Sequence, residues 1–358
     1  MSERFELRCV DDRSSSTVVD VARGLRRDLL GARVSGRACF VVDQRVHELW
    51  SSELGLDGAP VFLTPPGEAA KTPETLVALC RFLGQQNFER SATLVSIGGG
   101  ACGDVTGLAA SLYLRGVAVI HVPTTLVAMV DAALGGKTAI DLPEGKNLVG
   151  SFHTPTALLV DPDFLSTLPR SALLAGYGEI AKYAIGFDKV LADSVLRDGV
   201  LSDPEPLEAV ITRCLRIKAS VVANDLREAQ GGQRMRLNLG HTTAHAIEAW
   251  SLEQGRELAH GQAVAYGLRC ALRVARQEGL IADSDVARCE AVLDRVEAPT
   301  SLAALVAPAA APDASELTVY LRRDKKVHDQ ALRLVLPTAL GACTLRSCRL
   351  DTLLEALR

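Results

Sequence analysis

The chain has 358 residues, of which 48% are hydrophobic and 23% are charged, and its formal net charge is −4. This length predicts two domains with sizeable cores, and the composition is that of an ordinary soluble protein. The slightly acidic balance argues against a generally basic surface for nucleic acid or anionic membranes, so any basic site must be local.

The N-terminal segment, MSERFELRCVDDRSSS, lacks the apolar stretch of a secretory signal peptide. No run in the chain reaches the roughly 18 uncharged apolar residues of a membrane span. The nine cysteines are scattered and form no CxxC pair, which is typical of proteins in a reducing compartment. We therefore expect a cytoplasmic protein without disulfides that binds neither a membrane nor nucleic acid.

Short apolar runs alternate with helical patterns in the first half of the chain. Strands are predicted at residues 38–43, 59–65, 92–100, 117–123 and 157–162. Several of these runs are apolar without alternation, as in parallel strands that are buried on both faces. Helices are predicted between them at residues 72–86 and 104–114. This order predicts an α/β domain with a mainly parallel, Rossmann-like sheet.

Helical periodicity dominates the second half of the chain. It predicts helices at residues 171–186, 205–225, 240–250 and 261–279. The Ala- and Pro-rich stretch at residues 301–316 predicts a connecting loop. We therefore expect a first domain over residues 1–170 and a mostly α-helical second domain over residues 171–358.

A strand, a glycine turn and a helix follow one another in the stretch LVSIGGGACGDVTGLAAS. Gly98, Gly100 and Gly103 satisfy the GxGxxG pattern, which lets backbone N–H groups approach a pyrophosphate at a helix N-terminus. However, no acidic residue closes the next strand, where a ribose-binding carboxylate is expected. Asp104, in the first turn of the predicted helix, would repel a phosphate unless it is shielded. The motif alone leaves both nucleotide binding and a plain tight turn open.

Three further polar residues could line a crevice beside this turn. Asp43 ends the first predicted strand and is either a ribose ligand or the cap of the following helix. Glu68 and Lys71, in the sequence PPGEAAKT, either reach the same crevice or belong to a solvated loop.

A polar cluster lies in the glycine-rich stretch between residues 123 and 155. Asp131, Lys137, Lys146 and Asn147 are surrounded there by glycines and small apolar residues. Lysines beside glycines commonly hold phosphate or carboxylate groups, whereas two lysines alone would more often lie on surface loops. Because the surroundings are unusually apolar for surface loops, we expect a binding site for an anionic group.

Several metal-ligand candidates lie on the apolar helices of the second half. Glu179 has Lys182 three residues later on the same helix face, and His241 and His245 are four residues apart, which also places them on one face. His260 begins another helix. Two histidines and one glutamate suit a catalytic zinc site with an open position. The sequence HTTAH lacks the glutamate of the zinc-protease motif HExxH, which disfavours that class, and the spacing leaves open which histidines bind.

Taken together, the motifs resemble those of the 3-dehydroquinate synthase family of sugar-phosphate cyclases. The similarity is carried by GGGACGDVTG, LRGVAVIHVPTTLVAMVDAALGGKTAIDLPEGKNLVG, GEIAKY and LNLGHTTAHAIEA, and it extends from VVDQRV to LRLVLPTALG. It implies a shikimate-pathway lyase that converts 3-deoxy-D-arabino-heptulosonate 7-phosphate to 3-dehydroquinate and phosphate. The implied steps are transient oxidation by NAD, β-elimination, reduction and intramolecular aldol closure. The resemblance also implies a zinc or cobalt ion and a homodimer.

The resemblance assigns roles to individual residues. The implied metal ligands are Glu179, His241 and His260, whereas His245 contacts the substrate phosphate and handles a proton. The implied catalytic residues are Asp131, Lys137, Lys182, Asn238 and His245. The implied substrate-binding residues are Arg115, which reaches the neighbouring subunit, and Lys146, Asn147, Lys218, Arg234 and Lys326, the last preferred over Lys325. NAD is implied to contact Asp43, Glu68, Lys71, Gly99, Gly100, Asp104, Thr124, Thr125, Phe164, Thr167 and Leu168.

Some positions depart from the family's usual pattern. Ala132 and Ala133 follow Asp131 where VDSS is common, and GYGE stands where GxAE is frequent. Ser171 and Ala172 replace the usual Arg-Glu pair, and the segment before Arg234 looks two residues longer than typical. These differences concern cofactor contacts and loop geometry more than the chemistry.

Related cyclases are the nearest alternatives. Valiolone-type synthases replace the second histidine of GHTxxxH with proline, but His245 is present here. The deoxy-scyllo-inosose type lacks the GGK sequence and the asparagine before GHT, whereas Lys137 and Asn238 are present here. The motifs do not distinguish this function from that of an aminodehydroquinate synthase, which acts on an amino analogue of the substrate. A glycerol-dehydrogenase-like oxidoreductase shares the architecture but lacks phosphate-binding lysines. A non-enzymatic binding protein is disfavoured because the residues for metal, cofactor and substrate binding are all present.

Overall fold

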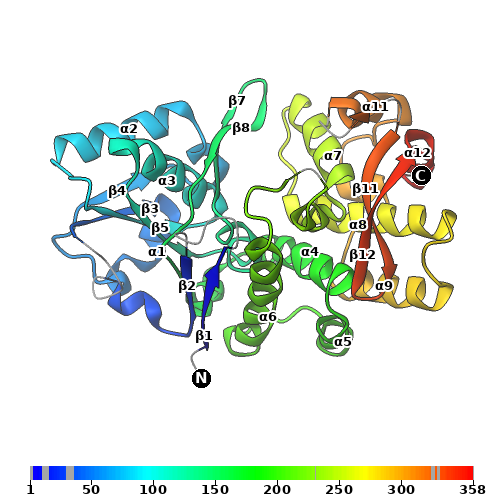
Figure 1. Cartoon of the computed structure of the whole chain (residues 1–358), viewed down its shortest axis with the longest axis horizontal. Helices are drawn as coiled ribbons and strands as arrows, with labels where there is room; N and C mark the ends of the chain where they lie inside the picture. Colours follow the sequence, from blue (N-terminus) through cyan, green and yellow to red (C-terminus); the bar gives the residue numbers. More distant parts are fainter. Residues whose placement is uncertain are drawn as a thin grey trace. The chain divides into compact units, whose positions relative to one another are not determined.

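The computed structural model describes residues 3–9, 16–29, 36–229, 231–323, 327–328 and 331–357. The chain forms two compact units (Figure 1): the first comprises Met1–Pro169 and Ser202–Arg227, and the second comprises Arg170–Leu201 and Glu228–Arg358. The expected division at residue 170 assigned Ser202–Arg227 to the second domain. The structure places this segment in the first unit because its helix α6 (Pro204–Ala223) packs against η4, η5 and β1 of that unit.

A seven-stranded sheet forms the centre of the first unit. Its order is β1-β2-β9-β6-β5-β3-β4. The strands are β1 (Glu3–Arg8), β2 (Ser16–Val21), β3 (Ala38–Asp43), β4 (Val61–Thr64), β5 (Thr93–Gly98), β6 (Ala118–Pro123) and β9 (Ala157–Val160). Among the described strands of this sheet only β1 and β2 pair antiparallel, so the predicted mainly parallel sheet and its five predicted strands are confirmed.

Continuous apolar runs form the inner strands because both faces of the sheet are covered. Cys39 and Val41 of β3 belong to a core with residues of α2 (Pro73–Gln85) and α3 (Gly100–Leu112). Phe40 and Val42 point to the opposite face, since side chains alternate along a strand, and they are equally buried. This burial on both sides is what the lack of alternation predicted.

The remaining short elements of the first unit connect the strands. They are α1 (Gln44–Leu54), η1 (Leu25–Asp28), η2 (Gly67–Ala70), η3 (Tyr113–Arg115), the π-helical turn η4 (Ala128–Ala132) and η5 (Pro162–Thr167). Helix α3 begins earlier than predicted, because the Gly103 N–H already donates to the Gly99 carbonyl at 3.1 Å. Asp104 therefore lies in the second turn of α3, and its predicted place in the first turn was wrong.

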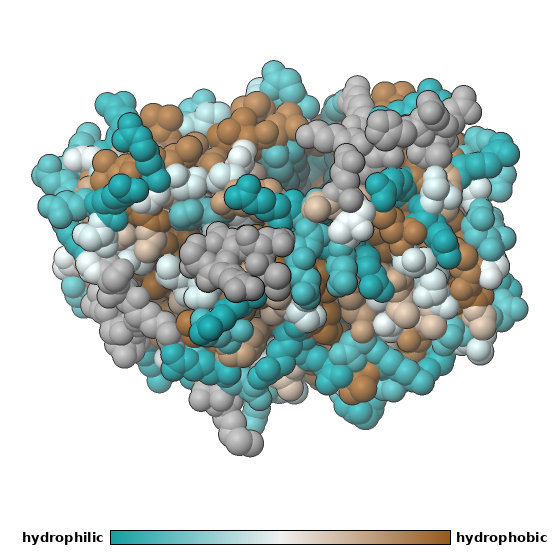
Figure 2. Space-filling model, viewed as in Figure 1, coloured by the Kyte–Doolittle hydropathy of each residue, from teal (hydrophilic) through white to brown (hydrophobic). Residues whose placement is uncertain are grey.

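A hairpin of β7 (Lys137–Leu142) and β8 (Gly145–Phe152) contains much of the polar cluster. Sequence analysis treated this stretch as turns and did not identify the strands. Three large apolar side chains of β8 are exposed, namely Leu148, Val149 and Phe152. Figure 2 shows apolar surface over the part of the first unit where Figure 1 places this hairpin and α3.

Helices dominate the second unit, as predicted. They are α4 (Arg170–Gly186), α5 (Lys189–Asp198), α7 (His241–Glu253), α8 (His260–Gln277), α9 (Asp283–Arg295), α10 (Leu302–Val306), α11 (Ala314–Arg323), α12 (Leu350–Ala356) and the 3-10 turn η6 (Gln233–Asn238). A three-stranded antiparallel sheet of β10 (Val327–His328), β11 (Ala331–Ala339) and β12 (Ala342–Arg349) was not predicted.

The stretch at residues 301–316 is more ordered than the predicted connecting loop. The Ser301 hydroxyl accepts a hydrogen bond from the Ala304 N–H and caps α10, whose Leu302 and Val306 are buried. Helix α11 also begins inside this stretch. The loop prediction was therefore wrong at both ends, because a cap and two buried residues suffice for a short helix. In the described part of the chain, no helix is both long and apolar enough to cross a membrane.

Candidate functional site

Glu179, His241 and His260 meet in the second unit. The Nε2 atoms of His241 and His260 lie 3.5 and 3.3 Å from Glu179 Oε1. One ligand atom from each of the three residues lies within 4.8 Å of the others. Lys182, one turn after Glu179 on α4, places its Nζ 2.6 Å from Glu179 Oε2. The structure thus brings together the three residues that the resemblance implies as metal ligands.

The Glu179 carboxylate is buried and poorly satisfied by protein donors. Its side chain is 1% exposed, and within the described residues neither oxygen has a partner with hydrogen-bond geometry. Burial raises the pKa of Glu179, but Lys182 and the imidazoles of His241 and His260 outweigh this and hold the pKa well below its usual range. A buried anion facing two imidazole nitrogens fits a borderline-soft divalent cation such as zinc or cobalt.

Both histidines are held through their second ring nitrogen. His241 Nδ1 lies 3.1 Å from the Leu239 carbonyl, and His260 Nδ1 lies 3.0 Å from Glu248 Oε1. An Nδ1–H that donates to these oxygens leaves the Nε2 lone pair for a metal. Sequence analysis did not identify Glu248. Helical spacing places it on the same face of α7 as His241, but its contact with His260 joins two helices and leaves no signal in that spacing.

Close helix packing positions this cluster. A Cβ atom at Gly178 would lie 1.9 Å from the Gly261 carbonyl oxygen, and a Cβ atom at Gly261 would lie 1.7 Å from the Ala175 carbonyl oxygen. Backbones of α4 and α8 therefore touch beside Glu179 and His260, which only glycine permits.

Other predicted residues of the second unit lie around α7 and η6. His245 is exposed, and its ring stacks at 6.1 Å between centroids on the ring of His260. The Asn238 side-chain amide donates to Glu228 Oε1 at 2.6 Å, and Arg234 is buried. Glu228 was not identified from the sequence. It lies in the segment before Arg234, outside the recognised motifs, where motif spacing gives no guide.

The glycine turn lies at the carboxyl end of β5. Gly98 accepts a hydrogen bond from the Thr124 N–H at 2.9 Å, and a Cβ atom at Gly99 would lie 3.2 Å from the Thr125 methyl group. A pocket is lined here by the glycine turn, β6, η4 and Lys137. Thus Gly99, Gly100, Asp104 and Lys137 line one pocket, and the two threonines adjoin the turn.

Lys71 shields Asp104, which was expected to repel a phosphate. The Lys71 ammonium is buried, lies 2.9 Å from Asp104 Oδ2 and donates to Asn147 Oδ1. Asp141 Oδ1 lies 3.8 Å from the same ammonium and accepts a hydrogen bond from the Asn147 N–H. Burial raises the pKa of Asp104 to about 6, although Lys71 lowers it. The structure therefore links Lys71, predicted to bind cofactor, to Asn147, predicted to bind substrate.

Further pairs join predicted residues of the first unit. The Lys218 ammonium of α6 donates to both the side chain and the backbone carbonyl of Asp131. Lys146 Nζ lies 3.7 Å from Glu68 Oε2 at the surface. Asp43 caps α1 by accepting from two backbone N–H groups with Oδ1, and its Oδ2 accepts from the Gly67 N–H. The structure shows the helix-cap role of Asp43 that the sequence left open.

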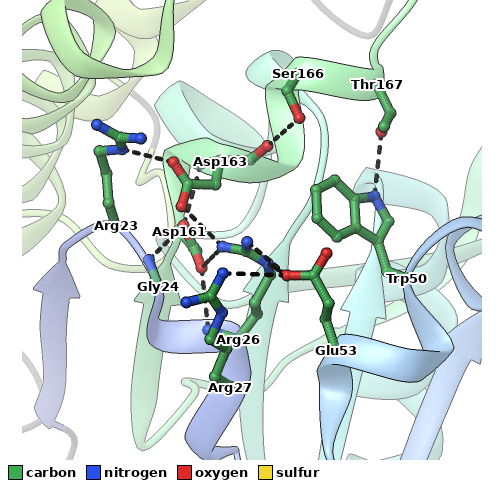
Figure 3. A network of polar contacts seen from close by, with 10 residues as sticks. All are labelled: Arg23, Gly24, Arg26, Arg27, Trp50, Glu53, Asp161, Asp163, Ser166 and Thr167. Atoms are coloured by element: carbon green, nitrogen blue, oxygen red, sulfur yellow. Dashed lines mark hydrogen bonds and ion pairs between the residues drawn. The ribbon is translucent and has the colours of Figure 1, made fainter.

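An ionic network fixes the segment that carries Phe164, Thr167 and Leu168 (Figure 3). Asp161, fully buried, accepts hydrogen bonds from the Arg26 guanidinium and from the Arg26 backbone N–H, both at 3.0 Å. The Arg26 guanidinium lies over the Trp50 ring. Trp50 in turn packs edge-on against Phe164 and donates to Thr167 Oγ1 at 3.1 Å.

Two further residues predicted to bind substrate are Arg115 and Lys326. Arg115 adopts a φ of 66° and the preceding Leu114 a φ of 49°, conformations that cost energy for residues other than glycine. Lys326 lies outside the described residues, as does Lys325.

His121 is a pocket residue that sequence analysis missed. It lies on β6, is 5% exposed, and its Nδ1 is 2.7 Å from Ser96 Oγ of β5. Both residues line the pocket beside the glycine turn. Burial, with a smaller contribution from His153, lowers the pKa of His121 to about 4. The signal available in the sequence was a histidine within the otherwise apolar predicted strand at residues 117–123.

We expect His121 to destabilise the protein in mild acid. Between about pH 6.5 and 4 the unfolded chain binds a proton at this imidazole and the native protein does not, so the free energy of unfolding falls by up to about 3 kcal/mol as the pH drops. Urea unfolding of wild type and His121→Gln at pH 7.5 and 4.5 should show a smaller loss in the variant. His47→Gln on α1 controls for loss of an imidazole outside the pocket. Parallel pH profiles for wild type and His121→Gln would contradict the expectation.

Comparison with known proteins identifies the family. Residues 61–175 match the family described as 3-dehydroquinate synthase N-terminal, and residues 176–327 match 3-dehydroquinate synthase C-terminal. A 3-dehydroquinate synthase from Rhodospirillum rubrum is 44% identical over 299 residues, which cover 82% of this chain and 76% of that protein.

Two solved structures share the whole architecture. A 2-deoxy-scyllo-inosose synthase complexed with carbaglucose-6-phosphate, NAD+ and Co2+ gives a TM-score of 0.85 at 26% identity, covering 99% of both chains. A 2-epi-5-epi-valiolone synthase from Streptomyces hygroscopicus with NAD+ and Zn2+ bound gives 0.84 at 26% identity, covering 95% of both. The chain therefore belongs to the 3-dehydroquinate synthase family.

Proposed function

We propose that the protein is a phosphate-eliminating carbon–oxygen lyase that converts 3-deoxy-D-arabino-heptulosonate 7-phosphate to 3-dehydroquinate and phosphate. The observation that carries the proposal is the buried Glu179 carboxylate facing His241 and His260 in a chain of this family. The sequence relative named as a 3-dehydroquinate synthase is 44% identical, whereas the two other cyclases are 26% identical. This difference favours dehydroquinate formation over the other cyclisations.

The proposed cofactors are NAD and one zinc or cobalt ion. Glu179, His241 and His260 would hold the metal, and the glycine turn at Gly99 and Gly100 would receive NAD, with its neighbours Asp43, Glu68, Lys71, Asp104, Thr124, Thr125, Phe164, Thr167 and Leu168. When bound, NAD would take up and return a hydride, and the metal would polarise a substrate oxygen. The related cyclases with NAD+ and Co2+ or Zn2+ support this assignment.

The chain's own residues would supply charge, orientation and proton transfer. In the first unit, Lys137, Lys146 and Asn147 would bind anionic and hydroxyl groups, and Lys218 would act with its partner Asp131. In the second unit, Lys182 and Arg234 would bind anionic groups by charge-assisted hydrogen bonds. His245 is exposed beside the metal cluster, which suits proton exchange, and Asn238 is oriented by Glu228.

We also propose that the protein is a homodimer. The exposed side chains of Leu148, Val149 and Phe152 form apolar surface on β8, and Leu112 and Leu114 add to the exposed apolar residues of this unit. The unfavourable backbone conformation of Arg115 beside Leu114 fits a residue held in place for binding. Sedimentation of a single-chain mass at micromolar concentration would overturn this assignment.

A cytoplasmic location is proposed as well. None of the nine cysteines forms a disulfide, which fits a reducing compartment.

Phosphate release from 3-deoxy-D-arabino-heptulosonate 7-phosphate tests the function. Purified protein with NAD and zinc or cobalt should release phosphate and form dehydroquinate, while absorbance at the NADH band stays flat because the hydride is returned. Absence of phosphate release, with turnover of the amino analogue of the substrate, would instead support an aminodehydroquinate synthase. Steady accumulation of NADH would indicate a dehydrogenase.

A further inference from the structure

We propose that Glu248 is a positioning residue that fixes the orientation and tautomer of His260 for metal binding. This inference rests on the metal site of the proposed function. Glu248 lies on α7, one turn after His245 and two turns after His241, so all three share a helix face. Its Oε1 lies 3.0 Å from His260 Nδ1, and its side chain is 12% exposed, which limits screening of this contact by water.

The contact decides which ring nitrogen of His260 is available. A neutral imidazole carries one N–H and one lone pair. When Nδ1–H donates to Glu248, the lone pair is on Nε2, and Nε2 is the atom that lies 3.3 Å from Glu179 Oε1. The carboxylate therefore points the lone pair of His260 at the ligand cluster and increases its basicity.

His260 needs this support more than His241 does. The His241 side chain is 9% exposed, and its Nδ1 faces the Leu239 carbonyl, a backbone group that a side-chain substitution leaves in place. The His260 side chain is 38% exposed, and it is the first residue of α8, so packing restrains its ring less. Its Nδ1 depends on the side chain of Glu248, and one substitution removes that support.

A rival arrangement uses the same side chains differently. His245, Glu248 and His260 also place one ligand atom each within 4.8 Å of one another. A second cation there would need the lone pair of His260 Nδ1, so it is incompatible with an Nδ1–H donated to Glu248. The metal stoichiometry separates the two arrangements, because the positioning role gives one ion per chain.

The test compares Glu248→Ala and Glu248→Gln with Glu253→Gln. Glu253 lies on the same helix and pairs with the Tyr320 hydroxyl at the surface, so its variant removes the same charge away from the cluster. Zinc and cobalt affinities are measured by competition with a chelator, cobalt coordination by visible absorption, and stability of the metal-free proteins by thermal unfolding. Glu248→Ala should bind metal about 10- to 100-fold more weakly and change the cobalt spectrum. Glu248→Gln keeps an acceptor oxygen and should lose less, whereas Glu253→Gln should match wild type.

Each other result counts against the proposal. The proposal is overturned if both Glu248 variants bind metal with wild-type affinity and give the wild-type cobalt spectrum. This holds even if the metal-free variants are less stable, because Glu248 would then have only a structural role. A stoichiometry that drops from two ions to one in Glu248→Ala supports the second cation site instead. If Glu248→Ala does not fold, weaker metal binding by Glu248→Gln than by wild type supports the proposal, and wild-type affinity overturns it. Failure of the wild type to bind either metal is a different outcome, since it would overturn the proposed metal site itself.

Discussion

Glu179→Gln is expected to remove the bound metal and to lower kcat/KM by more than about 100-fold. Glutamine keeps the volume of the side chain but carries no charge and is a poor metal ligand, and the loss of a direct ligand should exceed the 10- to 100-fold effects typical of supporting residues. Metal content after dialysis and phosphate release from the sugar phosphate measure the two effects.

The same substitution should also destabilise the protein. Lys182 is 1% exposed, and Glu179 lies 2.6 Å from its ammonium. Removing one partner of a buried ion pair typically costs about 3–5 kcal/mol. The double variant Glu179→Gln, Lys182→Gln removes both charges and should recover much of the stability without recovering metal. A Glu179→Gln protein that retains both metal and turnover would refute the ligand assignment.

Gly261→Ala is expected to lower the free energy of unfolding by more than about 3 kcal/mol and to weaken metal binding. A Cβ atom at Gly261 would lie 1.7 Å from the Ala175 carbonyl oxygen, so α4 and α8 must move apart by more than an ångström. Tight interiors tolerate such overpacking poorly. His260 is the neighbouring residue and Glu179 lies on the opposing helix, so the displacement separates two of the three proposed ligands.

Gly84→Ala is the matched control. Gly84 lies near the end of α2, and a Cβ atom there has no neighbour within 4 Å. Alanine should stabilise that helix by roughly 0.5–1 kcal/mol. Urea unfolding should therefore give a lower free energy of unfolding than wild type for Gly261→Ala and a higher one for Gly84→Ala. Equal stabilities of Gly261→Ala and wild type would mean that the helices separate at little cost.

The strands of the parallel sheet could be predicted from the sequence because burial on both faces leaves a continuous apolar run. The hairpin β7–β8 could not, because Lys146 and Asn147 interrupt its pattern and apolar side chains of β8 face outwards. Helix α10 was missed because two buried residues in an Ala- and Pro-rich stretch give no periodicity. The three-stranded sheet β10-β11-β12 was missed because it forms through pairing between strands inside a half of the chain where helical periodicity dominates.

The residue types of the metal cluster could be predicted, but their partners could not. Lys71 and Asn147 are 76 residues apart in sequence, and no spacing rule connects them. Glu248 was missed because its role depends on His260, which begins a different helix. Long-range pairs of this kind follow from the tertiary fold, and the sequence specifies them only through it.

Because Ser202–Arg227 belongs to the first unit, the chain cannot be divided into its two units by a single cut. The backbone passes between the units after residues 169, 201 and 227, so neither unit is one continuous segment. A fragment that ends at residue 169 would lack α6 and with it Lys218, the partner of Asp131. The remaining fragment would carry α6 without the η4 and η5 surfaces that bury it. Recombination between relatives by a single crossover at this point would therefore exchange an incomplete unit, whereas an exchange that also carries residues 202–227 would keep each core whole.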